Sequence, residues 1–127
     1  MRFFLAIFAL VLASPSAALA AARTDLRLAL WAKGEGIGSP RVLTLRCDPA
    51  GGTLPKPLGA CRRLDRLAAP FAPVPAGSAC SDVFSGPQVG IVTGSFRGRH
   101  VRAVFTRSDS CQTERWSRVS FLFPGVS

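Results

Sequence analysis

Four cysteines follow an N-terminal segment that has the features of an export signal, and this combination constrains the possible fold most. The segment begins with the positive charge of Arg2, continues in an unbroken apolar run over residues 3–13, and ends in small residues. The apolar run is too short to act as a stop-transfer helix. We therefore expect a cleaved signal peptide, with the cut after Ala20 or Ala22.

Removal of this signal peptide, residues 1–20, leaves residues 21–127, a length that forms one domain. Small exported domains bury a modest core and often add disulfides to it, so we expect a secreted, extracellular protein with two disulfides. Four cysteines allow three connectivities. The sequential one closes short loops, and would tie a strand to a helix and a loop to the end of a hairpin. The cysteines are Cys47, Cys61, Cys80 and Cys111.

The hydrophobic pattern predicts an α+β fold. Residues 58–67 place Leu58, Cys61, Leu64 and Leu67 on one stripe of a helix. Elsewhere apolar and polar residues alternate as in half-buried strands. We expect about five strands in an antiparallel sheet, with this one main helix packed on one face. The predicted strands cover residues 26–31, 41–47, 89–93, 101–106 and 119–123, the last from the alternation of Val119, Phe121 and Phe123.

The composition argues against several classes of function. The chain carries a formal charge of +9, and loss of Arg2 leaves +8, but its arginines are scattered as on a solvated face. We therefore expect neither nucleic acid nor a membrane as partner. Its one histidine, His100, lies beside a turn without a nearby nucleophile motif, and no phosphate loop or zinc-ligand spacing is present. The chain is not expected to be an enzyme or to hold a metal or cofactor.

One long segment is predicted to be a surface loop. Residues 69–77 contain three prolines and should be extended and irregular. Residues 78–87 are rich in short polar side chains, which surround the apolar Val83 and Phe84. Two apolar side chains should therefore be exposed in this loop.

Several segments together carry a resemblance to a known family. Residues 43–49, 52–55 and 60–64 are similar to its first-cysteine strand, the turn after it and its cysteine-bearing helix, although Leu54 stands where histidine is usual. Residues 87–101, 108–111 and 119–123 resemble the hairpin, the last-cysteine segment and the C-terminal strand. In joint order and spacing the chain resembles the Streptomyces subtilisin inhibitor family of secreted serine protease inhibitors.

This resemblance implies a function and a site. Such inhibitors present an extended loop to a subtilisin-like serine endopeptidase as a substrate would, and the loop is cut slowly because it is held rigidly. It also implies that Cys80 pairs with Cys111, that Asp82–Val83 is the reactive bond, and that Asp109 stands where an asparagine braces the loop. A homodimer built on the sheet is implied as well. The reactive loop would comprise Ser81, Asp82, Val83, Phe84 and Ser85.

The loop departs from the family pattern in length and chemistry. The distance from Cys80 to Pro87 is one residue longer than usual, so counting back from Pro87 makes Val83–Phe84 the reactive bond. A carboxylate such as that of Asp82 is also costly to bury in an apolar pocket. Three hypotheses remain open: a shifted loop, a protease that prefers acidic residues, or lost inhibition. In the last case the chain would be a secreted basic binding module that does not inhibit.

Overall fold

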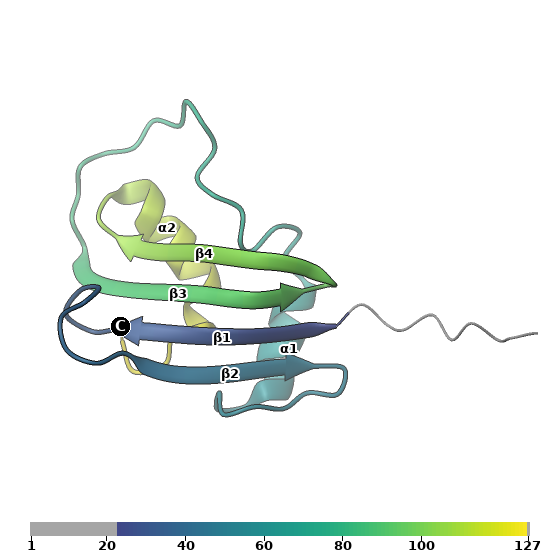
Figure 1. Ribbon diagram of the computed structural model, residues 1–127. Helices are drawn as coiled ribbons and strands as arrows, with labels where there is room; N and C mark the ends of the chain where they lie inside the picture. The colour runs from purple at the N-terminus through teal and green to yellow at the C-terminus, as the bar shows by residue number, and fades with distance from the viewer. Residues whose placement is uncertain (1–22, 127) are drawn as a thin grey trace, which may run out of the picture.

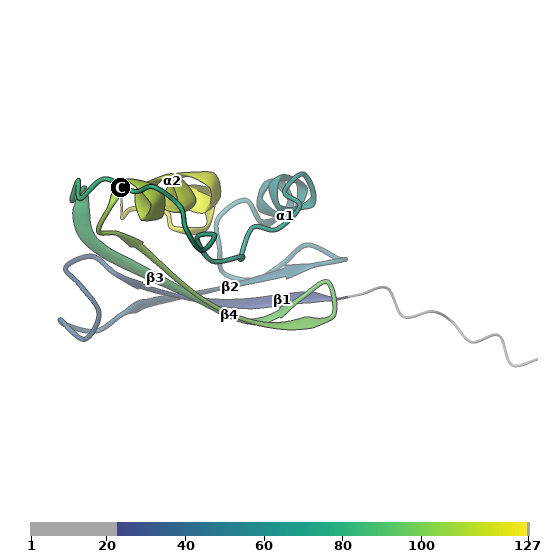
Figure 2. The same ribbon diagram turned by 90° about the horizontal axis from the view of Figure 1, so that it is seen from above.

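The computed structural model describes residues 23–126, in which both helices cover one face of an antiparallel sheet (Figure 1, Figure 2). The predicted α+β class is confirmed, and the predicted signal peptide lies outside the described residues. No helix in residues 23–126 is long and apolar enough to cross a membrane. The strands lie in the order β2-β1-β3-β4. The elements are β1 (Thr24–Trp31), β2 (Arg41–Cys47), α1 (Pro57–Asp65), β3 (Gly86–Phe96), β4 (Arg99–Arg107), α2 (Ser110–Val119) and the 3-10 turn η1 (Ser120–Leu122).

The core lies between the sheet and the two helices. Because side chains alternate across a strand, every second residue of β1 points to the helices, and Leu26, Leu28 and Leu30 are all buried. Leu45 and Leu43 of β2 lie opposite the first two of these in the antiparallel register. The alternation read from the sequence therefore identifies the buried face of the central strands correctly.

The prediction of a fifth strand at residues 119–123 is wrong. These residues complete α2 and form η1, so the sheet has four strands and the fold has a second helix. Asp109 begins α2 as its N-cap, where its side chain accepts a hydrogen bond from the Gln112 N–H at 2.8 Å. Trp116 and Val119 then face the core at helical spacing. The alternation of apolar residues over residues 119–123 therefore does not indicate a strand.

Helix α1 agrees with the predicted helix, although its buried stripe is shifted. Leu58 is 54% exposed, whereas Ala60, Cys61 and Leu64 are buried. Cys61 forms a disulfide with Cys47 at the end of β2, which confirms the sequential pairing for this half of the chain. The bridge ties α1 to the sheet, as predicted.

The β3–β4 hairpin turns through Arg97 and Gly98, and the same turn holds α1. Both residues have positive φ, which suits the twist of a two-residue hairpin turn. The Arg97 guanidinium donates to the carbonyls of Leu64 and Leu67, at 3.2 and 3.3 Å, and stacks on Phe96. A cation at the C-terminal carbonyls of a helix is favourable, so the hairpin stabilises α1 as well as the sheet.

Gly90 of β3 lets the C-terminal segment approach the sheet. A Cβ atom at this position would lie 2.7 Å from the Phe123 ring. That ring is buried and packs against Trp116 and Phe105, with centroid distances of 4.6 and 5.5 Å. The ring has no free side to move into, so the absence of a side chain at position 90 fixes where α2 and η1 lie.

We expect Gly90→Ala to lower the free energy of unfolding by about 1–3 kcal/mol, because the added methyl group overpacks the Phe123 site. Gly59→Ala is the control, since a Cβ atom there meets nothing within 4 Å inside α1. This control should raise stability by about 0.5–1 kcal/mol through helix propensity. Urea unfolding of both variants measures the difference. Equal stability of the two would contradict the proposed packing role of Gly90.

Candidate functional site

The long connection between α1 and β3 contains the candidate site. In Figure 1 this segment leaves the end of α1, arches beyond β4 and returns to the start of β3. Residues 80–85 form its last part, and Cys80 to Phe84 are all exposed. The predicted surface loop is therefore present, and it extends beyond the edge of the sheet.

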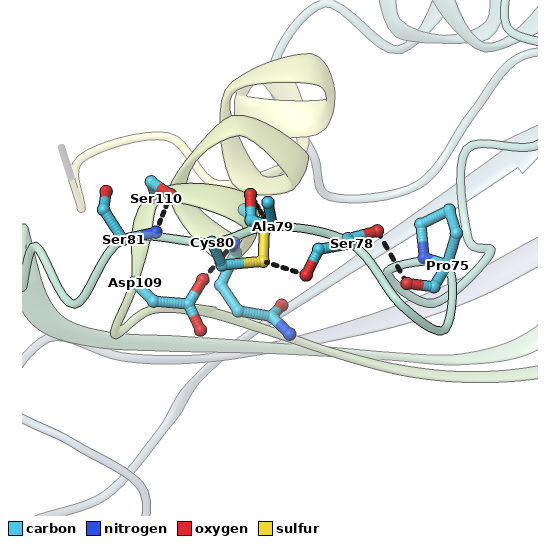
Figure 3. Close-up of a disulfide and its surroundings, with 9 residues drawn as sticks. Pro75, Ser78, Ala79, Cys80, Ser81, Asp109 and Ser110 are labelled. Atoms are coloured by element: carbon cyan, nitrogen blue, oxygen red, sulfur yellow. Dashed lines mark hydrogen bonds between the residues drawn. A yellow bond between two sulfur atoms is a disulfide. The ribbon is translucent and has the colours of Figure 1, made fainter.

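A disulfide fixes the start of this part of the loop. Cys80 is bonded to Cys111 in the first turn of α2, with 5.4 Å between their Cα atoms. The pairing of Cys80 with Cys111 is thus confirmed. It joins the loop to an element that is itself packed on the sheet, so the loop is held by the core (Figure 3).

Backbone hydrogen bonds hold the loop on both sides of its tip. The Ser81 N–H donates to Ser110 Oγ at 2.8 Å, and the Ser110 N–H donates to the Ser81 carbonyl at 3.0 Å (Figure 3). Four residues later, the Ser85 N–H donates to the Arg107 carbonyl at 2.8 Å. Residues 81 and 85 are therefore pinned to α2 and to the end of β4.

The three residues between these anchors present their side chains to solvent. Val83 is 59% and Phe84 66% exposed, and Asp82 is exposed as well. Within the described part of the chain, no hydrogen bond engages Asp82, Val83 or Phe84. Two adjacent apolar side chains held in solvent make this tip a candidate contact surface for another protein.

Comparison with known proteins identifies the family. The family model described as subtilisin inhibitor-like matches residues 22–109. The chain belongs to the subtilisin inhibitor-like family. No curated protein matches it. Among solved structures, Streptomyces caespitosus sermetstatin in complex with Bacillus licheniformis subtilisin has a similar fold, with a TM-score of 0.53 and 24% identity over 80% of this chain and 98% of that one.

In this subtilisin inhibitor-like domain the side chain of Asp109 caps a helix. Its carboxylate accepts from the Gln112 N–H and lies within 4.8 Å of the two bonded sulfur atoms. The hydrogen bonds that reach the loop from this segment come from the neighbouring Ser110. The sequence analysis missed Ser110, because nothing in its position marks it as a partner of a residue 29 positions earlier. The sulfurs offer no thiolate, so the cluster does not form a metal site.

A buried arginine supports the first part of the long connection between α1 and β3, and the sequence analysis missed it too. Arg115 of α2 donates to the Ala72 carbonyl at 2.8 Å and to the carbonyls of Phe71 and Val104. Its guanidinium stacks on Phe105, 4.1 Å from the ring centroid. Burial lowers the pKa of Arg115, and the charge of Arg118 lowers it further. The side chain thus joins the loop, β4 and α2 through carbonyl acceptors.

The residues that could suggest a catalytic triad do not have the required order. His100 lies opposite Ser95, and Ser95 lies opposite Asp25 across the sheet. In a serine hydrolase triad the histidine lies between the serine and the aspartate, whereas here the serine is in the middle. This row therefore lacks the arrangement needed for nucleophilic catalysis.

We expect Ser110→Ala to speed hydrogen exchange at the Ser81 amide about fivefold, because it removes an acceptor worth about 1 kcal/mol. Exchange at the Ser85 amide, which depends on the Arg107 carbonyl, should stay unchanged. Ser117→Ala is the matched control, since this exposed hydroxyl donates within α2, to the Thr113 carbonyl. Unchanged exchange at Ser81 in the Ser110 variant would refute the anchoring role.

Proposed function

We propose that this chain is a secreted inhibitor of subtilisin-like serine endopeptidases and has no catalytic activity of its own. Residues 80–85 enter the protease active site as a substrate would, and Asp82–Val83 is the reactive bond. The observation that carries this proposal is the exposed tip between two hydrogen-bonded anchors at Ser81 and Ser85. Membership of an inhibitor family and the similar fold of a subtilisin-bound protein support the choice of partner.

Rigidity explains how a substrate-like loop can inhibit. A flexible peptide must lose conformational freedom when it binds, whereas a loop already held in its bound shape loses little, so more of the contact energy appears as affinity. Here the disulfide and the hydrogen bonds of Ser81 and Ser85 hold the backbone before the protease arrives. After a cut the same anchors keep the new ends in place, which slows product release. Asp109 supports the loop indirectly, by capping the helix that presents Ser110 and Cys111.

The disulfide at the loop base should therefore matter for inhibition and not only for stability. We expect Cys80→Ser/Cys111→Ser to raise the inhibition constant about a hundredfold, because the loop must then be ordered on binding. Cys47→Ser/Cys61→Ser is the control: it removes about 2–4 kcal/mol of stability without releasing the loop. Its inhibition constant should change less than about tenfold.

The assay titrates the mature chain and both variants against subtilisin, trypsin and a glutamate-specific endopeptidase. Equal inhibition constants for the two double variants would contradict the role of the loop disulfide. If none of the three enzymes is inhibited by micromolar protein, the inhibitor proposal fails. The basic binding module, with an acidic partner, is then the remaining hypothesis.

We further propose that the chain forms a homodimer through the face of the sheet that the helices leave uncovered (Figure 2). An apolar row crosses this face: Val42 lies opposite Ala29, Ala29 opposite Ile91, and Ile91 opposite Val104. Val42 is 42% exposed and Val104 is half-buried, whereas Ala29 and Ile91 are 3% and 8% exposed, so the accessible apolar surface lies on the two outer strands, β2 and β4. An apolar face that is the same on two copies is suited to a symmetric dimer.

We expect Val42→Asp to weaken dimerisation by at least about tenfold, because the interface would bury an unpaired carboxylate. Ile37→Asp is the matched control, since Ile37 is equally apolar and 60% exposed but lies in the β1–β2 connection. Sedimentation equilibrium of the wild type and both variants tests the proposal. A monomeric wild type, or equal weakening by both substitutions, would overturn it.

A further inference from the structure

The anchors of the loop determine which of its backbone groups are free. In an extended segment, the N–H and C=O groups of one residue point to one edge and those of the next residue to the other edge. Ser81 directs its groups to Ser110, and Ser85 directs its N–H to Arg107. No residue from 80 to 85 has positive φ, so this alternation is not interrupted by a left-handed residue. In an extended loop held at these two anchors, the backbone groups of Cys80, Asp82 and Phe84 fall on the opposite, open edge.

This open edge matches the way a serine endopeptidase binds an extended chain. The enzyme adds a short antiparallel strand. The enzyme forms backbone hydrogen bonds with three residues of the bound chain. These are the residue whose side chain fills the specificity pocket, the residue two positions before it, and the residue two positions after it, beyond the cut bond. If Asp82 occupies the pocket, these three are Cys80, Asp82 and Phe84. Each of them lies on the open edge.

The two other registers conflict with hydrogen bonds already made. With Val83 in the pocket, the protease would need the backbone groups of Ser81 and Ser85, whose N–H groups each donate at 2.8 Å to the rest of the domain. With Phe84 in the pocket, it would need Gly86, which pairs with Arg107 in the sheet. Only the Asp82 register leaves every anchor intact, despite the longer spacing to the following proline.

The side chain in that register indicates the chemistry of the target. The Asp82 carboxylate is exposed on the loop and would be buried on binding. An apolar pocket would leave the charge unpaired at high cost, whereas a pocket lined by arginine, lysine or histidine would pair with it. On the basis of the proposed function, we infer that the preferred target is a serine endopeptidase that cleaves after acidic residues, with Asp82 as the specificity-determining residue.

The test compares Asp82→Met with Val83→Met in the mature chain, against a glutamate-specific endopeptidase and subtilisin. Both side chains are exposed, so neither change should alter the unfolding midpoint. The wild type should inhibit the glutamate-specific enzyme about a hundredfold more strongly, and Asp82→Met should reverse this preference. Val83→Met alters the residue after the cut bond, so it should shift both inhibition constants in the same direction and leave the preference between the two enzymes as in the wild type. After long incubation, mass spectrometry should find a single cut at Asp82–Val83.

The outcomes separate this inference from the proposed function. If Val83→Met switches the preference, or the cut follows Val83, inhibition stands but the register is overturned. If the wild type fails against the glutamate-specific enzyme while Asp82→Met inhibits subtilisin, inhibition again stands and the acid-specific target is overturned. If no form of the chain inhibits either enzyme, the proposed function fails, and this inference fails with it.

Discussion

The packing of α2 on the sheet is the constraint on which the rest of the molecule depends. Trp116 and Val119 are buried against the strands, and Phe123 fills the space that Gly90 leaves open. Once the helix is placed in this way, its first turn brings a helix cap, a hydrogen-bonding serine and a cysteine to the loop in three successive residues, Asp109 to Cys111. The hydrophobic core therefore fixes the position of the loop through α2, although residues 80–84 of the loop are themselves exposed.

The sheet could be predicted from the sequence because one of its faces is buried along every strand, whereas the other is buried only at its centre, at Ala29 and Ile91. Alternation along β1 and β2 is then unavoidable, and it was read correctly. The C-terminal segment was misread for two physical reasons. Phe121 is only partly buried at the rim of the core, beneath the guanidinium of Arg63, yet its spacing is that of an inward-facing strand residue. Arg115 is buried but charged, so it interrupts the apolar stripe that would have revealed α2.

The candidate site was predictable where it depends on local chemistry. The polar surroundings of Val83 and Phe84 were enough to predict a surface loop with exposed apolar residues, and the family resemblance supplied the Cys80–Cys111 pairing that holds it. The supporting contacts were not predictable, because they join residues far apart in the chain. Ser110 and Ser81 are 29 positions apart, and Arg115 and Ala72 are 43 apart. In each contact one partner is a backbone N–H or C=O group. Every residue carries such groups, so the sequence does not indicate which residue will be the partner.

The second disulfide also changes the topology of the chain. Its cysteines are 31 positions apart, so it closes a covalent ring that contains the loop tip and the whole β3–β4 hairpin. A single cut inside this ring converts the molecule from one chain into two without releasing either part, because the sulfur atoms still join them. β3 remains between β1 and β4 in the sheet. A cut of the loop would then be a change in connectivity within an otherwise intact fold, because each side of the cut keeps its own attachment, at Ser81 and at Ser85.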